Sequence, residues 1–381
     1  MATQRIINFL KTRRPESPCL VVDLDIIKEN YLGFEKALPQ SRVFYAVKAN
    51  PAPEILRFLA SLGSCFDTAS IAEIEMVLEA GVTPDRISYG NTIKKERDIA
   101  RAHVLGITLY AVDCFEEVKK VACAAPSARV FCRVFTDGAG AEWPLSRKFG
   151  CMPEVAVDVL RQANKLGLEA YGVSFHVGSQ QIDPTAWDRA LKDAANVFKN
   201  MAREGISLKM INLGGGFPTR YLKDVPTAQV YGMEIFNALS RHFGNRIPET
   251  IIEPGRGMVG NAGVIRAEVV LVSRRLDNDK DKDNIRWVYL DIGKFNGLVE
   301  TIGEAIRYPI VTPHDGDVVG PCVLAGPTCD SADIMYEKIP YELPLSLSVG
   351  DELFILGTGA YTTTYASVAF NGFGPLRSYV I

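Results

Sequence analysis

The sequence predicts an α/β protein: a closed (β/α)8 barrel of the TIM type, followed by a C-terminal antiparallel β domain. Eight apolar, β-rich runs recur along the first two thirds of the chain, and segments with helical periodicity lie between them. Such alternation implies parallel strands joined by right-handed crossovers, and eight units suit a closed barrel. After about Gly257 the runs become short and are joined by polar turns, with residues 278–284 (NDKDKDN) expected as a hairpin loop.

The barrel elements follow one another along the chain in a regular order. The helix expected over 70–81 begins at Ser70, has Glu73 three residues later as in a capping box, and ends at Gly81. The expected strands are residues 43–49, 64–69, 86–91, 107–113, 128–135, 169–178, 208–217 and 249–256. The helices expected between them include residues 53–63, 70–81, 153–167 and 187–205.

An open, doubly wound sheet is the structural alternative to the barrel. It lacks support, because the GxGxxG fingerprint is absent and the glycine cluster Gly214–Gly216 lies late in the chain. We therefore assign residues 24–258 to the barrel, and residues 1–23 and 259–381 to the β-rich domain. The strand-like run 19–24 is expected to join the β-rich domain.

Composition and charge exclude several classes of function. The 381 residues carry 42 Lys and Arg against 45 Asp and Glu, a net charge of −3, so nothing favours nucleic acid or a membrane surface as a partner. The eight cysteines form no CxxC pattern, which argues against a disulfide scaffold and a zinc site, and no metal is expected. No apolar run approaches the roughly 20 residues of a membrane span. The basic start leaves a transit peptide open, but a cytoplasmic location is favoured.

Reactive groups in such barrels lie where the strands end. Lys48 ends the first strand, where it either reaches out to water or is a desolvated lysine with a lowered pKa suited to imine formation. His176 ends the sixth strand, and a lone buried histidine is more often a core residue than a catalyst. Neither residue alone indicates a function.

The ends of the last two strands have the features of a phosphate site. Gly214–Gly216 follow the seventh strand, and Gly255 and Arg256 follow the eighth. Three glycines alone could form a simple turn, but with an arginine and the Ser179 hydroxyl they suit a phosphate cradle at the usual place in a barrel. A lysine, this cradle and the acid Glu253 together indicate pyridoxal phosphate, whose ring nitrogen the acid would keep protonated.

Six motifs extend this interpretation over nearly the whole chain: YAVKAN, FHVGS, GGGF, EPGR, GPTCD, and GAYT with FNGF. In this order they resemble the fold-III pyridoxal-phosphate-dependent decarboxylases for basic amino acids, the ornithine/lysine decarboxylase group. The resemblance implies a (β/α)8 barrel with a β domain, which agrees with the pattern above. It also implies pyridoxal 5′-phosphate as cofactor and a homodimer with shared active sites.

The resemblance gives each motif residue a role. Without it, Cys329 would be read as a small buried hydrophobe. By resemblance, Lys48 would hold the cofactor aldehyde, His176 would stack on the ring, Glu253 would pair with the ring nitrogen, Asp67 and Arg133 would lie near the cofactor, and Ser179, Gly214, Gly215, Gly216, Gly255, Arg256 and Tyr361 would bind the phosphate. From the partner subunit, Cys329 would donate a proton, Asp330 would bind the distal amine of the substrate, and Phe370 would help wall the pocket.

The substrate implied is a basic L-amino acid, with ornithine preferred and lysine turned over more slowly. Glu300 lies in the matching specificity segment and is expected to bind the distal ammonium with Asp330; the alternative is a solvated acid at a helix start. The resemblance also pairs Lys148 with Asp333 across the dimer interface. A diaminopimelate-type decarboxylase and an amino-acid racemase are the enzyme alternatives. A catalytically inactive binding protein resembling antizyme inhibitors is the non-enzyme alternative.

Overall fold

The computed structural model describes residues 2–143, 147–275 and 285–381, which form two compact units. The barrel unit comprises Lys28–Pro218 and Val225–Met258, and the β-rich unit comprises Met1–Ile27, Thr219–Asp224 and Val259–Ile381. Among the helices of the described residues, none combines the length and apolar character needed to cross a membrane.

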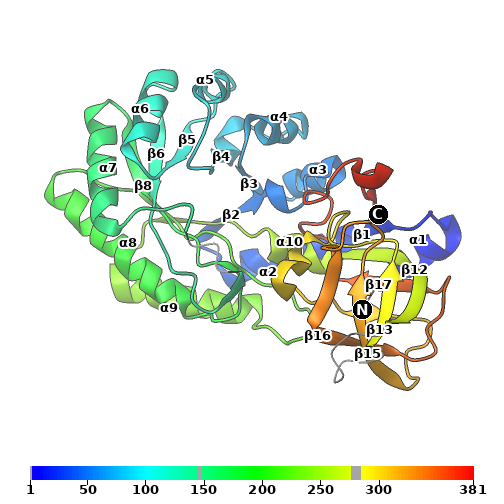
Figure 1. The fold of residues 1–381 in the computed structure, drawn as a ribbon. Helices are drawn as coiled ribbons and strands as arrows, with labels where there is room; N and C mark the ends of the chain where they lie inside the picture. Colours follow the sequence, from blue (N-terminus) through cyan, green and yellow to red (C-terminus); the bar gives the residue numbers. More distant parts are fainter. Residues whose placement is uncertain (1, 144–146, 276–284) are drawn as a thin grey trace. The chain divides into compact units, whose positions relative to one another are not determined.

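Eight parallel strands close the barrel, in the order β10-β11-β2-β3-β4-β5-β6-β8 (Figure 1). The barrel closes where Thr250 on β11 pairs with Ser41 on β2. Each strand overlaps one of the eight runs identified in the sequence, so the predicted barrel is confirmed. The strands are β2 (Ser41–Ala46), β3 (Cys65–Thr68), β4 (Ile87–Tyr89), β5 (Leu109–Val112), β6 (Arg129–Arg133), β8 (Glu169–Ser174), β10 (Met210–Asn212) and β11 (Glu249–Ile252).

Helices follow the strands and surround the barrel (Figure 1). The predicted Ser70 cap is confirmed, because its hydroxyl accepts from the Glu73 amide at 3.2 Å. The reciprocal bond of a capping box is displaced by one residue: the Glu73 carboxylate accepts from the Ala69 amide at 2.6 Å instead of the Ser70 amide. The helices are α2 (Leu24–Ala37), α3 (Pro53–Ser61), α4 (Ile71–Glu79), α5 (Glu96–Val104), α6 (Phe115–Ala124), α7 (Pro153–Lys165), α8 (Ala186–Arg203), α9 (Ala228–Phe243) and α10 (Arg256–Val259), with 3-10 turns η1 (Val47–Ala49) and η2 (Pro84–Arg86).

Two features of the barrel prepare a site at the carboxyl ends of its strands. A buried cluster with members from several strands, including Phe44, Phe131 and Ile251, forms part of the hydrophobic core. Beyond the strand ends, the short strands β7 (Ala141–Trp143) and β9 (Ser179–Gln181) pair antiparallel. The apolar cluster fills part of the barrel interior, so polar side chains of a site lie beyond the strand ends, next to the β7–β9 pair.

The β-rich unit corrects one prediction, because its sheet is mixed rather than antiparallel. Strand β13 pairs parallel with β15, since residues 291–318 separate them, and β1 pairs parallel with β18 from the other end of the chain. The prediction that residues 19–24 join this unit is confirmed, whereas the expected loop 278–284 lies outside the described residues. The elements are α1 (Gln4–Arg13), β1 (Cys19–Val22), η3 (Gly260–Ala262), β12 (Gly263–Arg275), β13 (Ile285–Leu290), η4 (Val299–Glu304), β14 (Ile310–Val311), β15 (Val319–Ala325), β16 (Ile334–Pro344), β17 (Glu352–Leu356), η5 (Phe370–Gly372) and β18 (Arg377–Val380).

Candidate active site

Lys48 lies at the mouth of the barrel, in the 3-10 turn that follows β2. Its Nζ is 3.6 Å from the Asp67 carboxylate at the middle of β3, whose residue is 5% exposed. Burial raises the pKa of Asp67, and the charge of Lys48 opposes that rise. Of the two alternatives for Lys48, a side chain that reaches out to water describes the single chain: because Lys48 extends from the turn beyond the strand, 45% of its side chain is exposed.

Asp67 owes its place to two residues of the neighbouring segment. The Ser88 hydroxyl on β4 donates to the Asp67 carboxylate at 3.1 Å. A Cβ at Gly90 would lie 1.8 Å from the same carboxylate, so a glycine is required there. The chain thus reserves space for a buried acid beside the lysine.

Glu253 follows β11 at the same end of the barrel. Although its surface is partly accessible, burial among protein atoms, together with the nearby charge of Asp67, raises its pKa to about 7. Asn212, the last residue of β10, donates from Nδ2 to Oε1 of Glu253, and its Oδ1 accepts from the Gly214 amide at 2.9 Å. Glu253 is therefore a poised acid in a fixed orientation.

The predicted phosphate cradle is brought together in the barrel unit. The buried guanidinium of Arg256, at the start of α10, donates from Nη2 to the Ser179 hydroxyl at 3.1 Å. Gly214 has φ +67°, and a Cβ there would lie 2.1 Å from the Phe175 carbonyl oxygen. Gly216 has φ +107°, and its Cβ would lie 2.6 Å from the Gly178 carbonyl oxygen. A buried cation, a hydroxyl and side-chain-free backbone suit an anion.

Arg133 completes the charged surroundings of Glu253, and His176, after β8, adds a neutral ring at the same end of the barrel. Burial and the charges of Arg133 and Lys48 lower the pKa of His176 to about 3, so its ring is neutral at physiological pH. Its Nδ1 accepts from the Gly178 amide at 3.0 Å, which fixes the ring. Arg133 ends β6, and its burial lowers its pKa while the charges of Glu253 and Asp67 support the cation.

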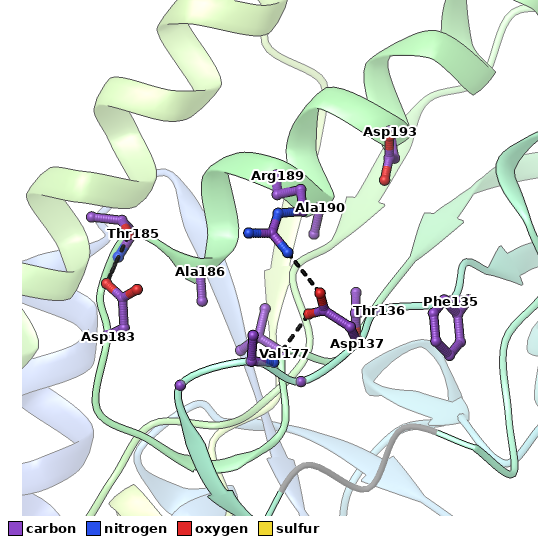
Figure 2. Close-up of a pocket in the computed structure, with 13 residues that line it drawn as sticks. Phe135, Thr136, Asp137, Val177, Asp183, Thr185, Ala186, Arg189, Ala190 and Asp193 are labelled. Carbon is purple, nitrogen blue, oxygen red and sulfur yellow. Dashed lines mark hydrogen bonds and ion pairs between the residues drawn. The ribbon is translucent and has the colours of Figure 1, made fainter.

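A separate pocket of about 260 Å³ lies beside the start of α8 and differs from the predicted site (Figure 2). Arg189 pairs there with Asp137 at 2.6 Å, and Asp183 accepts from the Thr185 amide at 2.9 Å (Figure 2). Three aspartates, with Asp193 the third, outnumber the single arginine of its lining. This pocket does not suit a phosphate.

Cys329 and Asp330 lie in the β-rich unit, on the loop between β15 and β16, and both are exposed. The alternative of a buried Cys329 is therefore wrong. Asn371 brackets Cys329: its Oδ1 accepts from the Cys329 amide at 3.0 Å and its Nδ2 donates to Sγ at 3.2 Å. Asp330 accepts from the Ala332 amide at 2.8 Å, so the loop has a defined shape.

Asp333 holds the loop between β15 and β16 in place through hydrogen bonds to its carboxylate. Its buried carboxylate accepts from the Thr328 hydroxyl at 2.8 Å, from the Thr328 amide at 3.2 Å and from the Lys294 amide at 2.7 Å. A Cβ at Gly293 or Gly326 would lie 2.3 Å from it. Asp333 is thus engaged within its own chain, and its pair with Lys148 across an interface, which the resemblance implies, stays a prediction.

Three further predicted residues also lie in the β-rich unit. Glu300, in η4, is 5% exposed, so the alternative of a solvated acid at a helix start is wrong. Phe370 is partly exposed and packs against Phe295 with ring centroids 5.7 Å apart. Tyr361 has φ +56° and lies 5.8 Å from Tyr365 between ring centroids.

Sequence reasoning missed the two asparagines and Ser88. Asn212 directly precedes the glycine cluster at a strand end, and this position was the available signal. Asn371 lies within the FNGF motif, so it too could have been singled out. Ser88 carried no signal, because an ordinary serine in a buried strand does not reveal which acid it contacts.

The barrel site fits pyridoxal phosphate. Arg256, Ser179 and the glycine backbone suit its phosphate, Lys48 suits its aldehyde, and Glu253 suits its ring nitrogen. A (β/α)8 barrel with this set of residues defines a class: the barrel enzymes that use pyridoxal phosphate.

Comparison with known proteins gives the family. A family model described as "Pyridoxal-dependent decarboxylase, pyridoxal binding domain" matches residues 24–260. The chain therefore belongs to the pyridoxal-dependent decarboxylases, and pyridoxal phosphate is its cofactor. Within this family it groups with the lysine/ornithine decarboxylases, which act on basic amino acids.

Individual relatives cover nearly the whole chain. It is 34% identical over 376 residues to a lysine/ornithine decarboxylase of Selenomonas ruminantium, covering 97% of this chain and 91% of the relative. It is 34% identical over 381 residues to antizyme inhibitor 2 of Xenopus laevis, covering 97% and 82%. The structure of a Vibrio vulnificus lysine/ornithine decarboxylase with cadaverine is 29% identical, with a TM-score of 0.88 and full coverage of both chains.

Proposed function

We propose that the protein decarboxylates L-ornithine to putrescine, with slower conversion of L-lysine to cadaverine, in polyamine biosynthesis. The observation that carries this proposal is the combination of Lys48, Glu253 and the Arg256–Ser179 cradle at one barrel mouth. Two of the relatives named above are lysine/ornithine decarboxylases, and the Vibrio vulnificus enzyme was solved in one structure with cadaverine and in another with putrescine.

In this proposal the barrel residues hold the cofactor. Lys48 would hold its aldehyde, and Asp67 and Arg133 would balance the charges around it. Arg256 and Ser179 bind the phosphate together with Gly214, Gly215, Gly216 and Gly255, and the assignment of Tyr361 to the phosphate stays a prediction from the sequence. His176, neutral because of its lowered pKa, stacks on the ring without adding a positive charge.

Glu253 sets the chemistry that the cofactor supplies. When bound, pyridoxal phosphate accepts the electron pair left on the α-carbon as carbon dioxide departs. Its ring nitrogen must carry a proton to do so, and Glu253 holds that proton on the nitrogen. The donor from Asn212 keeps the carboxylate in a fixed orientation for this task.

The α-carbon then needs a proton, which we assign to Cys329 of the partner subunit. Cys329 and Asp330 are exposed in the single chain, which supports their use by a second copy. Asn371 contacts both the amide and the sulfur of Cys329 and holds the thiol in place. The proposed working unit is a homodimer with shared sites.

Glu300 and Asp330 form the proposed receptor for the distal ammonium of the substrate. An ammonium has three donors and needs charged acceptors in a cleft that excludes water. Glu300 is 5% exposed, so its carboxyl group lies away from bulk water, where its interaction with an ammonium group would be less screened, and this supports a binding role. Phe370 would supply an apolar wall.

A catalytically inactive binding protein is the alternative that the antizyme inhibitor match brings forward. This chain keeps Lys48, Glu253 and Arg256 in one arrangement, and Cys329 on an ordered loop. A protein that served binding alone would have no need of them, so the enzyme is favoured. The cytoplasmic location expected from the sequence stays a prediction.

The substrate assignment is tested by kcat/KM for ornithine, lysine, arginine and diaminopimelate. Wild type is compared with Glu300→Gln and with Glu337→Gln, an exposed acid of the same unit, as control. We expect ornithine to lead, Glu300→Gln to lose at least tenfold on ornithine and lysine, and the control to stay within twofold. A preference for arginine or diaminopimelate, or a loss below twofold in Glu300→Gln, would overturn the assignment.

A further inference from the structure

Asn212 joins two parts of the site that otherwise come from different strands. It ends β10, is 1% exposed, and its amide uses one side for Glu253 and the other for the Gly214 amide. The Glu253 amide also donates to the Gly214 carbonyl at 2.9 Å. The acid proposed for the cofactor ring and the loop proposed for its phosphate are thereby linked twice.

We propose that Asn212 is a positioning residue that holds Glu253 as an anion, so that the proton shared with the cofactor lies on the ring nitrogen. This inference deepens the proposed function and rests on the role given there to Glu253. Asn212 acts through Glu253 and through the Gly214 amide.

The need for such a donor follows from the surroundings of Glu253. Burial and the charge of Asp67 favour the neutral acid, whereas Lys48, Arg133 and the Asn212 amide favour the carboxylate. A carboxyl group with a high proton affinity competes with a pyridine nitrogen for the single proton between them. An N–H donated to Oε1 lowers that affinity, and the proton moves to the ring.

The amide is suited to this task because both of its ends are engaged. Only the NH2 group can donate to Glu253, since the Asn212 oxygen accepts from the Gly214 amide. The side chain is therefore locked in one orientation. An aspartate here could accept from Gly214 but would face Glu253 with a second carboxylate.

The test measures the ring proton directly and does not depend on turnover. Pyridoxal phosphate labelled with 15N in its ring is bound to each variant, and nitrogen NMR reports the protonated fraction. Absorbance titration gives the dissociation constant of the cofactor. Asn212→Leu removes donor and acceptor at similar volume, and Thr250→Val removes another buried hydrogen bond, to Ser41 at 2.7 Å, from the far end of β11.

We expect Asn212→Leu to lower the protonated fraction of the ring nitrogen and to weaken cofactor binding at least tenfold. Thr250→Val should leave both quantities within twofold of wild type. If Asn212→Leu keeps the wild-type protonated fraction, the inference is wrong. Glu253→Gln distinguishes a failure of the Asn212 inference from a failure of the proposed role of Glu253. If the ring nitrogen stays protonated in Glu253→Gln, the proposed role of Glu253 itself is wrong.

Asn212→Asp provides a second variant that keeps the acceptor for Gly214. Its carboxyl can donate to Glu253 only while protonated, so the protonated fraction of the ring relative to wild type should fall as pH rises. The charged groups facing this pair are Lys48, Asp67 and Arg133, and they are unchanged in both proteins. A ratio that stays constant with pH contradicts the inference.

Discussion

Replacing Asp333 should release the loop that carries Cys329 and Asp330. Its carboxylate accepts three hydrogen bonds, two from Thr328 and one from the Lys294 amide, in a space kept open by neighbouring glycines. A hydrogen bond to a charged group contributes about 1.5–3 kcal/mol, and such bonds are not additive when they share one acceptor. Asp333→Ala is therefore expected to cost about 3–5 kcal/mol locally.

Hydrogen exchange followed by mass spectrometry measures this cost where it arises. A loss of 3 kcal/mol or more corresponds to at least about a hundredfold faster exchange in peptides containing Lys294 and Thr328. Asp333→Asn keeps the acceptor for one donor and should fall between wild type and Asp333→Ala. Asp317→Asn, an exposed acid that accepts from Ser346 at 2.6 Å, is the control.

Asp333→Ala should also disturb product formation, because the loop that carries the proposed proton donor Cys329 is displaced. Asp333→Ala is expected to raise the share of transamination products relative to the amine. Exchange rates within threefold of wild type in both peptides would refute the reasoning, since three satisfied bonds to a buried carboxylate could not then be holding the loop.

Three further predictions follow from other parts of the chain. Ser70→Ala should lower the free energy of unfolding by about 1 kcal/mol in a urea titration, because the Glu73 amide loses its cap, and an unchanged midpoint would contradict this. The pKa of Glu253 is raised from 4.5 to about 7 in the folded state, so the stability of the cofactor-free protein should fall as pH rises through this window. Melting curves of Glu253→Gln should lack that slope, and the prediction fails if they keep it. Mixed Lys48→Ala and Cys329→Ala subunits should regain about a quarter of wild-type activity if sites are shared, and none if they are not.

Much of the barrel could be predicted because its information is local. Each strand is a short apolar run, each helix has its own period, and the Ser70 cap marks a helix boundary directly. The β-rich unit was harder, because the pattern of a strand does not encode the direction of its partner. The parallel pairing of β13 with β15 depends on the path of residues 291–318.

Some site residues could likewise be predicted from local sequence, and others could not. Lys48, Glu253 and Arg256 follow strands and could be found by position, whereas the contacts of Asn212 and Asn371 depend on packing. Sequence reasoning also overlooked Lys94, which is fully buried with Nζ 2.9 Å from Glu117. A lysine in a basic run is ordinarily solvated, so only the fold reveals its burial.

Lys94 is the second lysine to consider for the bond to the cofactor aldehyde that we assign to Lys48. Burial lowers its pKa to about 8, which by itself would mark it as the more reactive lysine. It is nevertheless engaged by Glu117 and by the Ala111 carbonyl at 2.6 Å.

The deciding measurement is borohydride reduction of the purified protein loaded with pyridoxal phosphate, followed by peptide mapping of the modified lysine. We expect a pyridoxyl group on Lys48, and in Lys48→Ala we expect both this modification and the production of amine to be lost. Modification of Lys94 instead, or none on Lys48 in a preparation that releases carbon dioxide from ornithine or lysine, would contradict it.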